Sequence, residues 1–222
     1  MEVTEQGELA IPENKVPRWQ LLPARFFSYL LHPLLLVGWI TLFLLYLNPS
    51  TFLGADGEER LLVLLRVFST SLFLPLVTVL LLKGLGFIDS IQLRTQKERI
   101  IPYVACITFF FWSYYVAKQL DDPGELRAFL LGLFITAAVA LYLNNYFKIS
   151  MHTLGAGGMV ALFILLLLSG RLDSGFWMVV ALLLAGLIGT SRLLTGSHRP
   201  FEIYAGYVTG FVVQVICWWI VF

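Results

Sequence analysis

Charged residues are scarce in this chain. Lys, Arg, Asp and Glu together make up 13% of its 222 residues, whereas hydrophobic residues make up 59%. A soluble domain has about a quarter charged residues and about half apolar ones. The net charge is +1, and there is no basic arm of the kind that binds nucleic acid. The composition therefore excludes an ordinary soluble domain and predicts an integral membrane protein with no nucleic-acid partner.

Cysteine is equally scarce, with only Cys106 and Cys217, and both lie inside apolar runs. That placement is typical of small core residues and excludes a disulfide framework. No group of Cys, His and carboxylate residues has the spacing of a metal site, so we expect no metal and no other cofactor. The N-terminus lacks the basic head and apolar core of a signal peptide. We expect residues 1–25 to form a polar tail.

Long apolar runs are what the chain has in abundance. A membrane-spanning helix needs about 20 mostly apolar residues. The bilayer also requires each backbone polar group to be paired internally, and these runs are too long for barrel strands. The sequence therefore predicts an all-α polytopic transmembrane helix bundle, with one transmembrane domain at residues 26–222. The seven expected helices cover 26–47, 61–82, 100–117, 126–147, 153–169, 175–194 and 202–222.

Seven spans would bring three polar stretches to the same membrane face. The N-terminus and the loops after the second, fourth and sixth helices share one side, and these loops contain residues 94–102, 148–153 and 191–202. Lys and Arg are more numerous on this side, which favours the cytoplasm. The two sides become equal once the basic residues assigned below to phosphate are set aside. We therefore expect one polar site at this face, with only a slight preference for the cytoplasmic side.

The stretch 191–202, SRLLTGSHRPFE, places an ionisable cluster at the edge of two apolar segments. Such a cluster is expensive in a membrane and indicates a functional site. If a helix begins near Pro200, Glu202 lies four residues past His198 and reaches its ring. The carboxylate would fix the imidazole tautomer and leave the other nitrogen free to attack or to carry a proton. The alternative is a basic loop at the membrane edge that contains a histidine by chance.

The stretch 94–102 holds three basic residues, Arg94, Lys97 and Arg99. A guanidinium offers a planar fork to two phosphate oxygens, and an ammonium offers a mobile point charge. The alternative is an ordinary basic loop at the membrane surface. In the stretch 148–153, KISMHT, Ser150 and His152 precede an expected helix, whose N-terminal amides suit an anion. The alternative there is a His that hydrogen-bonds a neighbouring helix.

Taken in order, the three stretches resemble the three signatures of the type 2 phosphatidic acid phosphatase superfamily. The third signature reads Ser-Arg, five residues, His, three residues, Asp, and here Glu202 replaces the Asp. The middle signature is Pro-Ser-Gly-His, and here Ile149 and Met151 replace Pro and Gly. The first signature has Lys six residues before an Arg-Pro pair, and here two Ile separate Arg99 from Pro102. The resemblance covers about residues 94–222.

The resemblance implies a lipid phosphatase that forms a phosphohistidine intermediate. His198 would be the nucleophile, His152 the general acid that protonates the leaving oxygen, and Glu202 the residue that orients His198. Phosphate would be bound by Arg192, Arg99, Lys97, Arg94, Ser150 and Ser191. The expected substrate is a phosphomonoester or pyrophosphate on a membrane lipid, and the expected location is the bacterial inner membrane. A lipid phosphotransferase and a non-catalytic lipid-binding or transport protein remain open as alternatives.

Overall fold

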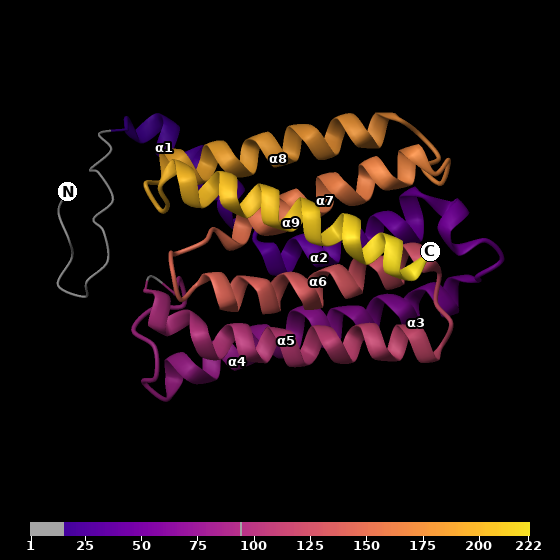
Figure 1. Ribbon diagram of the computed structural model, residues 1–222, viewed down its shortest axis with the longest axis horizontal. Coiled ribbons are helices and arrows are strands. Elements are labelled where there is room, and N and C mark those ends of the chain that lie inside the picture. The colour runs from indigo at the N-terminus through magenta and orange to yellow at the C-terminus, as the bar shows by residue number, and fades with distance from the viewer. Residues whose placement is uncertain (1–15, 94) are drawn as a thin grey trace.

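The computed structural model of the chain describes residues 16–93 and 95–222, and within these ranges it contains helices and no strand (Figure 1). Arg94 lies outside the described residues. Two π-helical segments, Phe43–Leu47 and Ser69–Phe73, extend α2 and join α3 to α4. The α-helices are α1 Arg18–Leu30, α2 Pro33–Leu42, α3 Gly57–Phe68, α4 Leu74–Gly84, α5 Gln96–Gln119, α6 Gly124–Leu143, α7 Met151–Leu168, α8 Phe176–Leu194 and α9 Pro200–Val221.

Six helices of the described chain are long and apolar enough to cross a membrane, and a bent pair at the N-terminal end gives a seventh. The joined α3 and α4, from Gly57 to Gly84, form one of the six, and α5 to α9 form the others. The prediction of an all-α transmembrane bundle is therefore confirmed, and the chain is an integral membrane protein.

The first expected helix, at 26–47, is broken in the structure. α1 and the α2 segment meet at a bend of 60°. Pro33 is the first residue of α2, and His32 before it is extended, because a proline disfavours helical geometry in the residue that precedes it. The ring Nδ1 of His32 accepts a hydrogen bond from the backbone N–H of Leu34 and caps α2. α1 begins at Arg18, inside the stretch expected to be a polar tail.

Close contact between α7 and α9 fixes the position of the polar residues at their ends. A Cβ added to Gly157 would overlap the backbone carbonyl of Tyr207, and one added to Gly210 would overlap the carbonyl of Leu154. Small residues allow membrane helices to approach to backbone contact in this way. The start of α7 is therefore held against the start of α9, where the backbone N–H of Ser150 donates to the carbonyl of Glu202.

The loops fall at two ends of an elongated bundle. α1 and the α4–α5, α6–α7 and α8–α9 connections lie at the left end in Figure 1, and the C-terminus lies towards the other end. This is the convergence that the alternation of spans predicts. The opposite end is held by ion pairs between Arg66 and Asp122 and between Arg171 and Glu125.

Candidate active site

His198 and Glu202 lie where the α8–α9 connection meets the start of α9. They belong to a group of polar residues, called here the polar cluster, that also includes Arg99, Ser150, His152 and Arg192 and their contacts Ser28 and His32. α9 begins at Pro200, so Glu202 lies in its first turn and its Oε2 is 2.8 Å from Nδ1 of His198. The carbonyl of Lys148 is 3.1 Å from the same nitrogen, and the backbone N–H of Arg199 donates to the same carboxylate. A carbonyl and a carboxylate oxygen both accept, so Nδ1 carries the proton. Nε2 of the neutral ring therefore holds the lone pair.

The surroundings of His198 keep its ring neutral. Its pKa is lowered from the ordinary 6.5 to about 4, mainly because the residue is buried. The hydrogen bond from His198 to Glu202 opposes this effect, whereas the positive charges of Arg99 and Arg192 add to it. At neutral pH the imidazole therefore has an unprotonated Nε2, which is the form required of a nucleophile or a general base.

Arg99 is buried in the first turns of α5 and joins two loops at this end of the bundle. Its Nε donates to the carbonyl of Leu93 at 2.9 Å, and its Nη1 donates to the carbonyl of Ile149 at 2.8 Å. Arg99 also interacts electrostatically with His198 and Arg192. A buried positive charge thus lies beside the proposed nucleophile.

Two buried hydrogen-bonding atoms in the cluster have no partner in the part of the chain that the structure describes. They are Oγ of Ser150, which precedes α7, and Nε of Arg192, in the last turn of α8. Buried polar atoms are nearly always paired, and an unpaired one costs about 1–3 kcal/mol. The backbone N–H of Ser150 donates to the carbonyl of Glu202, and Arg192 interacts electrostatically with His198, so a ligand bound next to this pair could supply the missing partners.

His152 lies in the first turn of α7 and interacts electrostatically with both Arg192 and His198. Its Nε2 is 3.0 Å from the backbone carbonyl of Ser28, so this nitrogen carries a proton and donates it to α1. Its ring also meets the ring of His32 edge to face, with centroids 5.3 Å apart. His152 thus hydrogen-bonds a neighbouring helix, α1, as the structural alternative for this residue expects.

The other predicted phosphate-binding residues are Lys97, Ser191 and Arg94. Lys97 is exposed, and it lies two residues from buried Arg99, which places the two about 200° apart around α5. Ser191 is buried in α8, where its backbone carbonyl accepts hydrogen bonds from Thr195. Arg94 cannot be placed, because it lies outside the described residues.

Two residues of the cluster come from a part of the chain that shows no resemblance to the phosphatase signatures. Ser28, in α1, contacts both His152 and Arg192, and His32, at the α1–α2 break, contacts His152. His32 stands out in the sequence as a polar residue in an apolar run, although it has no partner at recognisable spacing. Ser28 gives no sequence signal.

The cluster contains no combination of residues suited to a metal. Within the described ranges, no group of three or more His, Cys, Asp and Glu side chains is placed to hold an ion. Apart from Glu202, which is paired with His198, the charged residues that interact with His198 are Arg99 and Arg192, and their charge favours an anion as the ligand.

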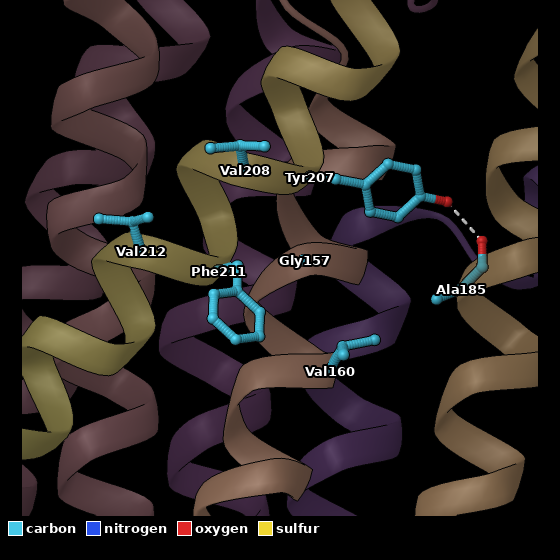
Figure 2. Close-up of a pocket in the computed structure, with 7 residues that line it drawn as sticks. All are labelled: Gly157, Val160, Ala185, Tyr207, Val208, Phe211 and Val212. Atoms are coloured by element: carbon cyan, nitrogen blue, oxygen red, sulfur yellow. Dashed lines mark hydrogen bonds between the residues drawn. The ribbon is translucent and has the colours of Figure 1, made fainter.

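An open apolar groove of about 300 Å³ lies further along the same helices (Figure 2). It is lined by residues of α7, α8 and α9, among them exposed Val208 and Val212, and the hydroxyl of Tyr207 donates to the carbonyl of Ala185 at one side. Gly157 in its wall lies five residues past His152, and Tyr207 lies five residues past Glu202. At 1.5 Å per residue, the groove is about 8 Å from His152 and Glu202 along the helix axes.

No known protein family, curated protein or solved structure matches the chain. The resemblance to the phosphatase signatures therefore stays a prediction that depends on the three short stretches.

Proposed function

We propose that the chain is a metal-independent lipid phosphatase related to the type 2 phosphatidic acid phosphatases. The observation that carries this proposal is the pair of unpartnered buried atoms, Ser150 Oγ and Arg192 Nε, on residues that adjoin the His198–Glu202 pair. A phosphoryl group supplies several strong acceptor oxygens and an electrophilic phosphorus. Its oxygens can accept hydrogen bonds from Ser150 Oγ and Arg192 Nε, and its phosphorus can be attacked by Nε2 of His198.

The chemistry divides into two displacements at phosphorus. Nε2 of His198 attacks, and the N–P bond forms as the bond from phosphorus to the lipid oxygen breaks. The positive charge that develops on the ring is stabilised by Glu202, and charge on the phosphoryl oxygens by Arg99 and Arg192. His152, protonated on both ring nitrogens when the phosphoryl anion is bound, donates its Nε2 proton to the departing oxygen. The neutral His152 then accepts a proton from the water that attacks phosphorus, so the N–P bond breaks, inorganic phosphate leaves, and both rings return to their starting forms.

The apolar groove supports a lipid rather than a soluble substrate. Its lining is apolar and open to the outside of the bundle, so an alkyl chain can lie along it from the membrane. A lipid held by its phosphate near His198 would extend a chain towards the groove. The proposed substrate is a phosphomonoester or pyrophosphate on a lipid of the bacterial inner membrane.

One observation favours a second candidate, a lipid-binding protein without catalysis. The proton of His152 that the mechanism needs is donated to the carbonyl of Ser28 in this conformation. A protein that keeps this contact would bind a phosphorylated lipid and leave its phosphate ester intact.

Phosphate release from defined lipids separates the candidates. The purified protein is assayed in detergent with EDTA, using phosphatidate or a polyprenyl diphosphate, in the wild type and in His198→Asn. Ser169→Ala, at the opposite end of the bundle, is the matched control. The proposal predicts release by wild type and control and a loss of about 10³ or more in His198→Asn, as expected for a nucleophile. Binding without release by any variant supports the lipid-binding candidate. Equal release by wild type and His198→Asn contradicts the mechanism, and transfer to an added alcohol in place of release identifies a phosphotransferase.

A further inference from the structure

We infer that α1 is a movable lid, which closes the site by placing Ser28 where substrate phosphoryl oxygens bind and opens by turning outward at the α1–α2 break. The inference rests on the proposed function for the identity of the group that Ser28 replaces. The lid itself rests on three features of α1, namely its contacts, its shallow attachment and its hinge.

Ser28 engages two of the groups that the proposed reaction requires. His152 donates from Nε2 to the backbone carbonyl of Ser28 at 3.0 Å, and Arg192 donates from Nη1 to the hydroxyl at 3.2 Å. Both acceptors are oxygens on one residue. The proposed reaction needs the Nε2 proton of His152, so the departing oxygen of a substrate and the carbonyl of Ser28 compete for it. A phosphoryl group on the free Nε of Arg192 would bind to the same guanidinium that holds the hydroxyl of Ser28 through Nη1.

The attachment of α1 to the bundle is shallow. Ala24 and Ser28 are its buried residues, whereas α7 buries half of its length. The outer face carries Trp19, Leu22 and Phe26, which are 71%, 69% and 61% exposed. An amphipathic helix of this kind lies in the membrane interface with its apolar face in lipid. Phe27 is the partly buried side chain of α1 that packs against the main hydrophobic core, so turning α1 outward uncovers Ala24 and one face of Phe27, fewer apolar side chains than α7 buries.

The proposed hinge is the break between α1 and α2 at Leu31 and His32, and its α2 side is held firmly. Leu31 is buried in the main hydrophobic core, and His32 caps α2 through its hydrogen bond from Leu34. Pro33 begins α2 immediately afterwards and prevents α1 and α2 from forming one continuous helix. The 60° bend thus has a rigid side, α2, and a weakly attached side, α1.

A spin-label distance measurement tests the lid without using catalysis. Cys106 and Cys217 are replaced by Ala, and labels are placed at Arg25→Cys on α1 and Asn145→Cys in the α6–α7 loop, both exposed positions. Orthovanadate serves as the phosphoryl analogue, and its binding is measured separately by equilibrium dialysis. Ser28→Ala removes the hydroxyl acceptor, Ser28→Thr retains it, and Ser169→Ala is the control.

If α1 is a lid, we expect one main distance between the two labels in the wild type and a second, different distance in Ser28→Ala. A hydrogen bond to a charged group is worth about 1.5–3 kcal/mol, so the ratio of open to closed lid should rise about tenfold or more. Bound vanadate should produce the same second distance in the wild type. Ser28→Thr and Ser169→Ala should match the wild type without ligand.

Each outcome tests the movement of α1 separately from the phosphatase activity. An unchanged distribution in folded Ser28→Ala overturns the lid, whatever the protein hydrolyses. Vanadate that binds the wild type and leaves the distance unchanged also overturns it, and this arm does not depend on the folding of any Ser28 variant. A shift in Ser28→Ala with no vanadate binding supports the lid and contradicts the proposed phosphoryl site.

Discussion

Two substitutions at Glu202 separate the charge of this side chain from its reach. Glu202→Gln keeps the length and removes the charge, so the amide oxygen can still accept from Nδ1 of His198. Glu202→Asp keeps the charge and shortens the side chain by one carbon, about 1.5 Å. The present Oε2 to Nδ1 distance is 2.8 Å, so an Asp carboxylate would lie beyond hydrogen-bonding range.

The size of each effect follows from the bond that is lost. A hydrogen bond to a charged group contributes about 1.5–3 kcal/mol, and a neutral one about 0.5–1.5 kcal/mol. Gln therefore costs about 1–2 kcal/mol, which is about a 5- to 30-fold loss of kcat/KM. Asp loses the whole charged bond and leaves only the carbonyl of Lys148 on Nδ1, a loss of about 10- to 150-fold. The expected order of activity is Glu, then Gln, then Asp.

Initial rates of phosphate release from phosphatidate in mixed micelles give kcat/KM for the three proteins, and thermal unfolding in detergent checks that each is folded. The predicted order makes Asp the least active residue at position 202, although the phosphatase signature that this stretch resembles has Asp at the corresponding position. A Glu202→Asp protein as active as the wild type would refute the reasoning, since it would show that the carboxylate does not act through the 2.8 Å contact seen here.

Three further predictions follow from the same cluster. The chain has three His, so ¹⁵N-His NMR should resolve the ring of His198 with Nδ1 protonated from pH 5 to 8 and a midpoint near 4. Because the pKa of His198 in the folded protein lies below 6.5, the neutral ring should contribute fully to the free energy of unfolding above about pH 6.5, and this contribution should decline as the pH falls towards 4. A measured midpoint near 6.5 would show that the ring is not buried as described. Arg99→Gln should lower both phosphate release and thermal stability, because it leaves the carbonyls of Leu93 and Ile149 unpaired. Lys97 is exposed, so the activity of Lys97→Gln should stay within about twofold of wild type. A larger loss of activity in Lys97→Gln than in Arg99→Gln would contradict a role for Arg99 in the site. Single cysteines at Glu5 and exposed Glu58, in a background without native cysteines, should report the orientation. An impermeant reagent in intact cells should reach position 58 and not position 5, and the opposite pattern places the site outside.

Much of the fold could be predicted from the sequence, because hydrophobic length determines where a chain crosses a membrane. The start of α9 at Pro200 and the His198–Glu202 contact also followed from local spacing. The break before α2 did not, although Pro33 was visible, because proline inside an apolar run is compatible with both a kink and a new helix. The contact of Ser28 with residues of α7 and α8 depends on tertiary packing and leaves no periodic signal.

The opposite placement of Lys97 and Arg99 was within reach of the sequence. Thr95 and Glu98 form a reciprocal cap at the start of α5, and this pairing is a recognised sequence signal for a helix start. A helix that begins there places positions two residues apart on nearly opposite sides. Charge alone suggested one cluster of three bases, whereas the helical register separates them.

The phosphorylated intermediate tests the central claim most directly. The wild type is mixed with phosphatidate labelled with ³²P, quenched in detergent at alkaline pH, and digested for mass spectrometry, with His198→Asn and Ser169→Ala treated in parallel. The account predicts an acid-labile phosphoryl group on His198 in the wild type and in Ser169→Ala, and none in His198→Asn. Label on another residue, or full turnover of phosphatidate by His198→Asn, would contradict it.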